Sequence, residues 1–143
     1  MARRSQKTAS IYITKPDYLR LSALIEKTRE GNGVDREYLN KLEAELDRAE
    51  IVDPKEIPVD VITMRSTVRL KDLVSGDENT YSLVFPTEAD FSEGKISVLA
   101  PIGMAILGYK QGDTIKWSVP SGMRKLKVEE ILYQPEAAGH YNL

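Results

Sequence analysis

The chain has 143 residues, enough for one domain or for a small domain with an appended helical element. Apolar residues make up 41% and charged residues 29%, which predicts a packed core and excludes disorder throughout. A net charge of −2 argues against a protein that mainly coats nucleic acid, and the lack of cysteine excludes disulfides and thiolate sites. No apolar run is long enough for a membrane span, and the basic N-terminus lacks the apolar stretch of a secretory signal. We therefore expect a cytoplasmic protein with no membrane partner.

Residues 1–56 predict an N-terminal tail followed by a short antiparallel helical hairpin. Thr14 and Asp17 have the form of a capping box, and apolar residues then recur at steps of three and four. Gly31-Asn32-Gly33 breaks this pattern, and a second helix is expected from Asp35, a good N-cap residue. Each arm has about four turns, which makes the hairpin about 20–25 Å long. The coiled-coil seam is expected to consist of Leu21, Ile25, Leu39, Leu42 and Leu46.

Residues 57–143 predict a sheet domain, separated from the hairpin by a proline-containing linker over residues 53–59. Alternating apolar residues predict strands around Val68, Leu83 and Ile96, over residues 114–119, and after residue 122. In the last strand the apolar residues change parity after Val128, which predicts a β-bulge near Glu129.

A short apolar helix is expected over residues 101–107. It begins at Pro101, where a missing N–H does no harm, and ends at Gly108, which tolerates left-handed dihedral angles. Because the helix is apolar almost all round, we expect it to be buried. The sequence therefore predicts an α+β fold, in which a short antiparallel coiled-coil hairpin precedes an antiparallel sheet domain with one short helix.

The residues themselves indicate no catalytic centre. His140 is the only histidine and lies in a tail that we expect to be loose, so neither a metal site nor a Ser-His-Asp arrangement can be assembled around it. The glycines around Gly108 match neither a phosphate-binding loop nor a dinucleotide fingerprint. We expect no catalytic residue, no metal and no cofactor.

Several motifs resemble the C-terminal domain of the Gre transcript-cleavage factors. They are Ile96-Ser97-Val98, Ala100-Pro101-Ile102-Gly103, Ala105-Ile106-Leu107-Gly108, Gly112-Asp113 and Pro120-Ser121-Gly122. An N-terminal antiparallel helical hairpin is also the Gre layout. Within this superfamily, residues 42–143 are most similar to the regulators of nucleoside diphosphate kinase. That similarity includes Leu46-Asp47-Arg48-Ala49, Pro58-Val59-Asp60-Val61-Ile62-Thr63-Met64 and Ile131-Leu132-Tyr133-Gln134-Pro135-Glu136-Ala137-Ala138-Gly139.

The resemblance implies an FKBP-like C-terminal domain that docks on RNA polymerase at the rim of the secondary channel. The implied partner-binding residues are Leu99, Pro101 and Ile102. Gre factors carry acidic residues at the hairpin tip that help bind the catalytic magnesium. Here Glu30, Asp35 and Glu37 flank the tip.

This hairpin is much shorter than a Gre hairpin, which bears on transcript cleavage. A carboxylate that stops a turn short of the active site cannot ligate magnesium, because the metal–oxygen distance is about 2.1 Å. We therefore expect a transcription regulator that occupies the channel rim, competes with Gre factors and lacks cleavage activity. Sequence-specific binding of nucleic acid is not expected.

Two alternative functions are left open. The FKBP-like fold alone suggests a peptidyl-prolyl isomerase, but fold is not function, and an aromatic-lined pocket is hard to build from Trp117, Phe85, Phe91 and scattered tyrosines. The family name suggests a regulator of the level or activity of nucleoside diphosphate kinase.

Overall fold

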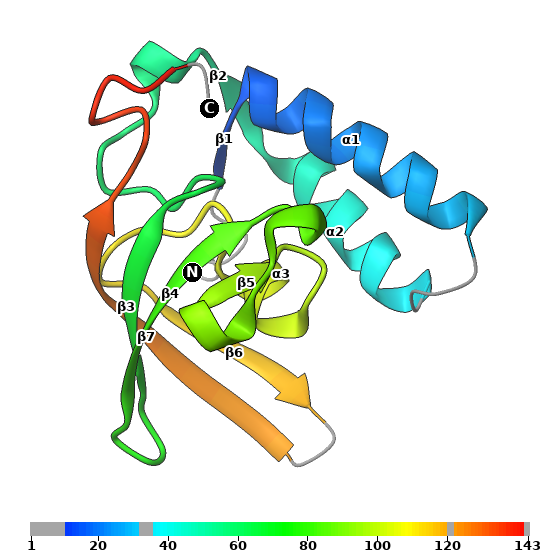
Figure 1. Ribbon diagram of the computed structural model, residues 1–143. Coiled ribbons are helices and arrows are strands. Elements are labelled where there is room, and N and C mark those ends of the chain that lie inside the picture. Colours follow the sequence, from blue (N-terminus) through cyan, green and yellow to red (C-terminus); the bar gives the residue numbers. More distant parts are fainter. Residues whose placement is uncertain (1–10, 32–35, 120–121, 142–143) are drawn as a thin grey trace, which may run out of the picture. The chain divides into compact units, whose positions relative to one another are not determined.

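The computed structural model describes residues 11–31, 36–119 and 122–141 (Figure 1). It is an α+β structure with helices and a mixed sheet. The chain divides into two compact units, Met1–Ile57 and Pro58–Leu143, and each is described by itself.

The first unit contains two helices and a small parallel ribbon. Its elements are β1 (Tyr12–Thr14), α1 (Lys15–Glu30), α2 (Arg36–Arg48), β2 (Glu50–Val52) and the 3₁₀ turn η1 (Pro54–Glu56). The predicted cap is present, because the Thr14 hydroxyl accepts a hydrogen bond from the backbone N–H of Asp17 at 3.3 Å. At a rise of about 1.5 Å per residue, α1 is about 24 Å long and α2 about 20 Å.

The two helices pack through apolar side chains and one charged cluster. The last turn of α1 contacts the first half of α2, since Arg29 Nη2 lies 2.8 Å from Asn40 Oδ1 and 2.7 Å from Glu43 Oε1. At the other end, β1 before α1 pairs with β2 after α2, so the helices run in opposite directions. The buried side chains of these helices include Leu21, Ile25, Leu39, Leu42 and Leu46.

The second unit is built on a five-stranded sheet with strand order β5-β4-β3-β7-β6. The strands are β3 (Thr67–Asp72), β4 (Glu78–Val84), β5 (Lys95–Ser97), β6 (Thr114–Val119) and β7 (Gly122–Tyr133). Our prediction of a purely antiparallel sheet is wrong at one edge, because β5 pairs with β4 in parallel. The connection over residues 85–94 contains the 3₁₀ turns η2 (Pro86–Glu88) and η3 (Phe91–Glu93) and returns the chain toward the start of β4.

Helix α3 (Pro101–Ile106) is less buried than predicted. Gly103 and Ile106 are buried, whereas Pro101 is exposed and Ile102 is half-buried. The helix has fewer than two turns, so only its strand-facing side is covered. The predicted end of the helix at Gly108 is confirmed, since Gly108 has a left-handed φ of +82° just after the last helical residues.

The predicted β-bulge is present in β7. Leu70 pairs with Val128 and Arg69 pairs with Glu130, which leaves Glu129 as the extra residue. A second irregularity, which we did not predict, lies between the pairs Val68–Ile131 and Thr67–Tyr133.

The segment after β7 is not the loose tail that we expected. The side chain of Gln134 is buried, and its Nε2 donates to the carbonyl oxygens of Pro58 at 2.9 Å and Val61 at 2.7 Å. Glu136 Oε1 accepts a hydrogen bond from the Thr63 hydroxyl at 2.7 Å. These bonds tie the segment to the start of the unit.

The histidine in this segment also has a partner. The Tyr133 hydroxyl and His140 Nδ1 are 2.6 Å apart. The bonds of Gln134 and Glu136 described above also show that the segments 58–64 and 131–139, both named in the family resemblance, meet in the structure.

Candidate functional site

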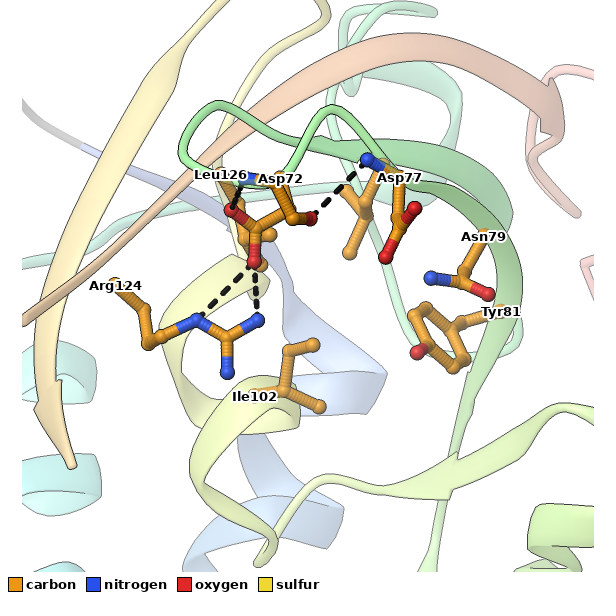
Figure 2. A pocket seen from close by; sticks show the side chains of 9 residues that line it. Asp72, Asp77, Asn79, Tyr81, Ile102, Arg124 and Leu126 are labelled. Atoms are coloured by element: carbon orange, nitrogen blue, oxygen red, sulfur yellow. Dashed lines mark hydrogen bonds and ion pairs between the residues drawn. The ribbon is translucent and has the colours of Figure 1, made fainter. Parts of the chain in front are cut away.

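A small hollow lies on the inner side of the sheet, beside the start of α3 (Figure 2). It encloses about 80 Å³. Ligand pockets typically measure about 300–1,000 Å³, so the hollow fits the end of one side chain better than a substrate. Its lining consists of Leu70, Asp72, Ser75, Asp77, Asn79, Tyr81, Ile102, Arg124 and Leu126.

One wall of the hollow is an ion pair between β3 and β7. Arg124 donates from Nε to Asp72 Oδ2 at 3.1 Å and also from Nη2 to the same oxygen. Asp72 Oδ1 accepts the backbone N–H groups of Val74 at 2.8 Å and Ser75 at 3.1 Å. The Arg124 guanidinium, followed by these backbone donors, holds the pKa of the Asp72 carboxyl below its usual value. Asp72 therefore stays ionised and fixes both the hairpin turn and the arginine.

The opposite wall is a polar row formed by β4 and the residue just before it. Asp77, Asn79 and Tyr81 follow one another at every second residue, so they share one face of the strand. Figure 2 shows Asn79 and Tyr81 across the hollow from Arg124. This wall carries a carboxylate, an amide and a phenol hydroxyl.

Helix α3 supplies the third side through Ile102. The helix lies very close to β5, because a Cβ atom added to Gly103 would be 2.2 Å from the carbonyl oxygen of Ser97. Only glycine fits there, and this fixes the start of the helix against the sheet. Leu99 is half-buried just before the helix, and its N–H donates to Ser97 Oγ at 3.0 Å.

The three predicted partner-binding residues are thus close together in the chain but differ in exposure. Pro101 is exposed, while Leu99 and Ile102 are half-buried, and Ile102 alone of the three lines the hollow. Together they form an apolar edge beside the hollow.

The predicted acidic residues belong to the other unit. Glu30 is exposed at the end of α1 and Glu37 is exposed in the first turn of α2. Asp35 lies outside the described residues. Over the described part of the chain, no group of three or more His, Cys, Asp or Glu side chains is arranged to hold a metal ion.

Sequence reasoning missed the ion pair and the polar row, although the strand pattern carries a signal for both. Asp72 continues the inward parity of Val68 and Leu70, and Arg124 continues that of Leu126 and Val128. A charged residue at an inward position of a strand indicates a buried or half-buried partner.

Comparison with known proteins gives two matching families. The family model of the C-terminal part of the transcription elongation factors GreA/GreB matches residues 49–133, and that of the Rnk N-terminus matches residues 10–52. The chain is 47% identical over 103 residues to the regulator of nucleoside diphosphate kinase of Escherichia coli strain K12, which covers 71% of this chain and 76% of that protein. It is 36% identical over 110 residues to transcription elongation factor GreA of Christiangramia forsetii, covering 77% of this chain and 70% of that protein.

A solved structure agrees with these relatives. The prokaryotic transcription elongation factor GreA/GreB from Nitrosomonas europaea superposes with a TM-score of 0.73 at 44% identity, covering 87% of this chain and 100% of that one. The fold of this chain is thus similar to that of a GreA/GreB factor. The chain belongs to the GreA/GreB transcription elongation factor family, in the branch that carries the Rnk N-terminus. Within the described residues, no helix is both long and apolar enough to cross a bilayer.

Proposed function

We propose that this protein is an RNA polymerase-binding regulator of transcription that acts in the cytoplasm and is not an enzyme. Residues 57–143, for which we propose an FKBP-like fold, dock at the rim of the secondary channel and compete there with Gre factors. The helical hairpin within residues 1–56 is presented toward the channel. The membership in the GreA/GreB family supports this proposal.

The observation that carries the proposal is the apolar edge at the start of α3. Pro101 is exposed and Ile102 is half-buried beside the hollow, within the part of the chain that the GreA/GreB model matches. Proline at a helix start has a fixed φ angle and loses little entropy when a partner covers it. The adjacent hollow can receive one polar side chain of the partner.

The lengths of α1 and α2 support a role without transcript cleavage. Arms of about 24 Å and 20 Å carry Glu30 and Glu37 at their ends. Because magnesium ligation needs an oxygen at about 2.1 Å, a tip that stops one turn short acts only through charge and bulk.

Binding of the purified chain to core RNA polymerase, measured by biolayer interferometry, tests the proposal. Pro101→Asp should weaken binding about thirtyfold, since a central contact is worth about 2 kcal/mol or more. Val59→Asp is the matched control, because Val59 is 69% exposed in the same unit but outside the site. Unchanged binding by a folded Pro101→Asp variant would place the contact elsewhere.

A second candidate function is regulation of nucleoside diphosphate kinase. It is favoured by the 47% identity to a protein named as a regulator of that enzyme. Adding the purified chain to the purified kinase and measuring phosphoryl transfer tests a direct effect. A change in kinase activity that survives Pro101→Asp would favour this function over polymerase binding.

A further inference from the structure

Four lysines gather on the face of the sheet opposite the hollow. In the strand register, Lys71 of β3 is paired with Lys127 of β7, and Lys125 of β7 is paired with Lys116 of β6. Lys125 and Lys127 are two residues apart and therefore share a face. The intervening Leu126 is buried against the other side, whereas Lys116, Lys125 and Lys127 are exposed. We call these four residues the lysine face.

The positive charge of the lysine face is poorly compensated. On the same side of the sheet, Arg69 pairs with Glu130 at 2.9 Å and with Glu78 at 3.4 Å. The lysine face has one long contact, between Lys127 Nζ and Glu129 at 3.8 Å. Among the described residues, no ion pair is formed by the other three lysines. Glu78 stands opposite Lys71 in the β3–β4 register, but its carboxylate pairs with Arg69. One end of this surface is thus balanced and the other is basic, in a chain of net charge −2.

Like charges placed opposite each other on neighbouring strands are destabilising. Paired residues on adjacent antiparallel strands have Cα atoms about 4.5–5.5 Å apart, and residues two apart along a strand are about 6.8 Å apart. Four lysines carried at this backbone spacing concentrate positive charge on a small area of the surface. An extended polyanion satisfies the whole set better than a single carboxylate.

We propose that the lysine face binds the phosphate backbone of a nucleic acid without reading its sequence. Lysine binds phosphate as a compact point charge, and a group of such charges neutralises a phosphate backbone without reading its bases. The neighbouring positions on this face are Arg69, Glu78, Thr80 and Thr114, and none of them carries an aromatic ring on which a base could stack. Binding is therefore electrostatic and independent of the proposed contact with polymerase at α3.

Fluorescence anisotropy with a labelled DNA duplex of about 20 base pairs tests this inference on the full chain. Four neutralised phosphates give a slope of log K against log salt of about −3.6, or about a hundredfold weaker binding at 200 mM than at 50 mM. The triple variant Lys116→Gln, Lys125→Gln, Lys127→Gln should flatten the slope by about 2.7. The corresponding triple Lys→Arg variant should retain binding.

The matched control is Lys27→Gln, Lys41→Gln, Lys95→Gln. It removes the same three charges from exposed positions outside the lysine face and should bind like the wild type. The inference is overturned if the wild type does not bind at low salt, or if both triple variants lose affinity equally. It is also overturned if poly-L-glutamate at equal charge displaces the duplex as well as unlabelled duplex does. None of these readouts involves polymerase.

Discussion

At the scale of single residues, the Asp72–Arg124 pair links the turn of one hairpin to the strand of another. Asp72 uses one carboxylate oxygen for two backbone N–H groups and the other for the guanidinium of Arg124. The side chain of Asp72 is only 7% exposed, while that of Arg124 is 44% exposed. The carboxylate is thus the buried member of the pair, and the arginine is the more exposed one.

We predict that Asp72→Asn lowers the stability of the protein at neutral pH. The substitution should also remove part of the decrease in stability that the wild type shows in acid. The pKa of Asp72 is lowered in the folded state, chiefly by the hydrogen bond from Arg124. The ionised carboxylate therefore makes its full contribution to stability at pH values well above the unfolded-state pKa of about 3.9. This contribution to stability is lost as the pH falls through the lowered pKa that Asp72 has in the folded state. Urea unfolding between neutral and acidic pH should show wild type and variant converging in acid.

Glu78→Gln is the control for this prediction. It removes one carboxylate from an ion pair with Arg69 whose side chains are 36% and 47% exposed, so stability should change by less than about 0.5 kcal/mol. A constant gap between wild type and Asp72→Asn down to acidic pH would contradict the assigned role.

At the scale of elements, the two units have separate apolar interiors. That of α1 and α2 includes Leu21, Leu42 and Leu46, and that of the sheet includes Val68, Leu70 and Val128. Both helices are near the length below which isolated helices are marginal in water, so their mutual packing supplies most of their stability.

We predict that Leu42→Ala loosens α1 and α2 while the sheet unit keeps its stability. Leu42 is fully buried, and such truncations cost about 2–5 kcal/mol. Amide hydrogen exchange should show faster exchange in both helices and unchanged protection in β3 and β7. Leu19→Ala is the control, because Leu19 is 59% exposed on α1. Equal loss of protection in helices and sheet would show that the units unfold together.

At the scale of the whole molecule, charge is distributed unevenly. Acidic residues flank the predicted hairpin tip, while the lysine face concentrates positive charge on the sheet. The net charge of −2 conceals this division. Such fields steer association and are screened by salt over about 10 Å at 0.1 M ionic strength.

We predict that the tip residues act by charge and bulk and not as magnesium ligands. Neutralising them together, as Glu30→Gln, Asp35→Asn and Glu37→Gln, should weaken polymerase binding only a few-fold, and more at low salt. Asp47→Asn, Glu50→Gln and Glu56→Gln form the control with the same charge change at exposed positions. Transcript cleavage in a backtracked elongation complex that is stimulated by the wild type and abolished by the tip variant would refute this prediction.

The sequence alone determined those features that depend on near neighbours in the chain. The cap at Thr14, the stop at Gly108 and the bulge at Glu129 follow from local hydrogen bonding, glycine dihedral angles and side-chain parity. Family membership also followed from short motifs, because their residues are contiguous. The resemblance to Gre factors also implied Leu99, Pro101 and Ile102 as one group, and their contact with polymerase is still a prediction.

Tertiary structure decided everything that depends on which strands are neighbours. Parity tells which face a residue takes, but the path of residues 85–94 makes β5 parallel to β4. Asp72 and Arg124 are 52 residues apart in sequence and meet only because β7 pairs with β3. The lysine face arises in the same way, since register across strands brings together charges that no local pattern connects. The bonds of the buried Gln134 likewise join the end of the chain to the carbonyl groups of Pro58 and Val61, which are more than 70 residues earlier.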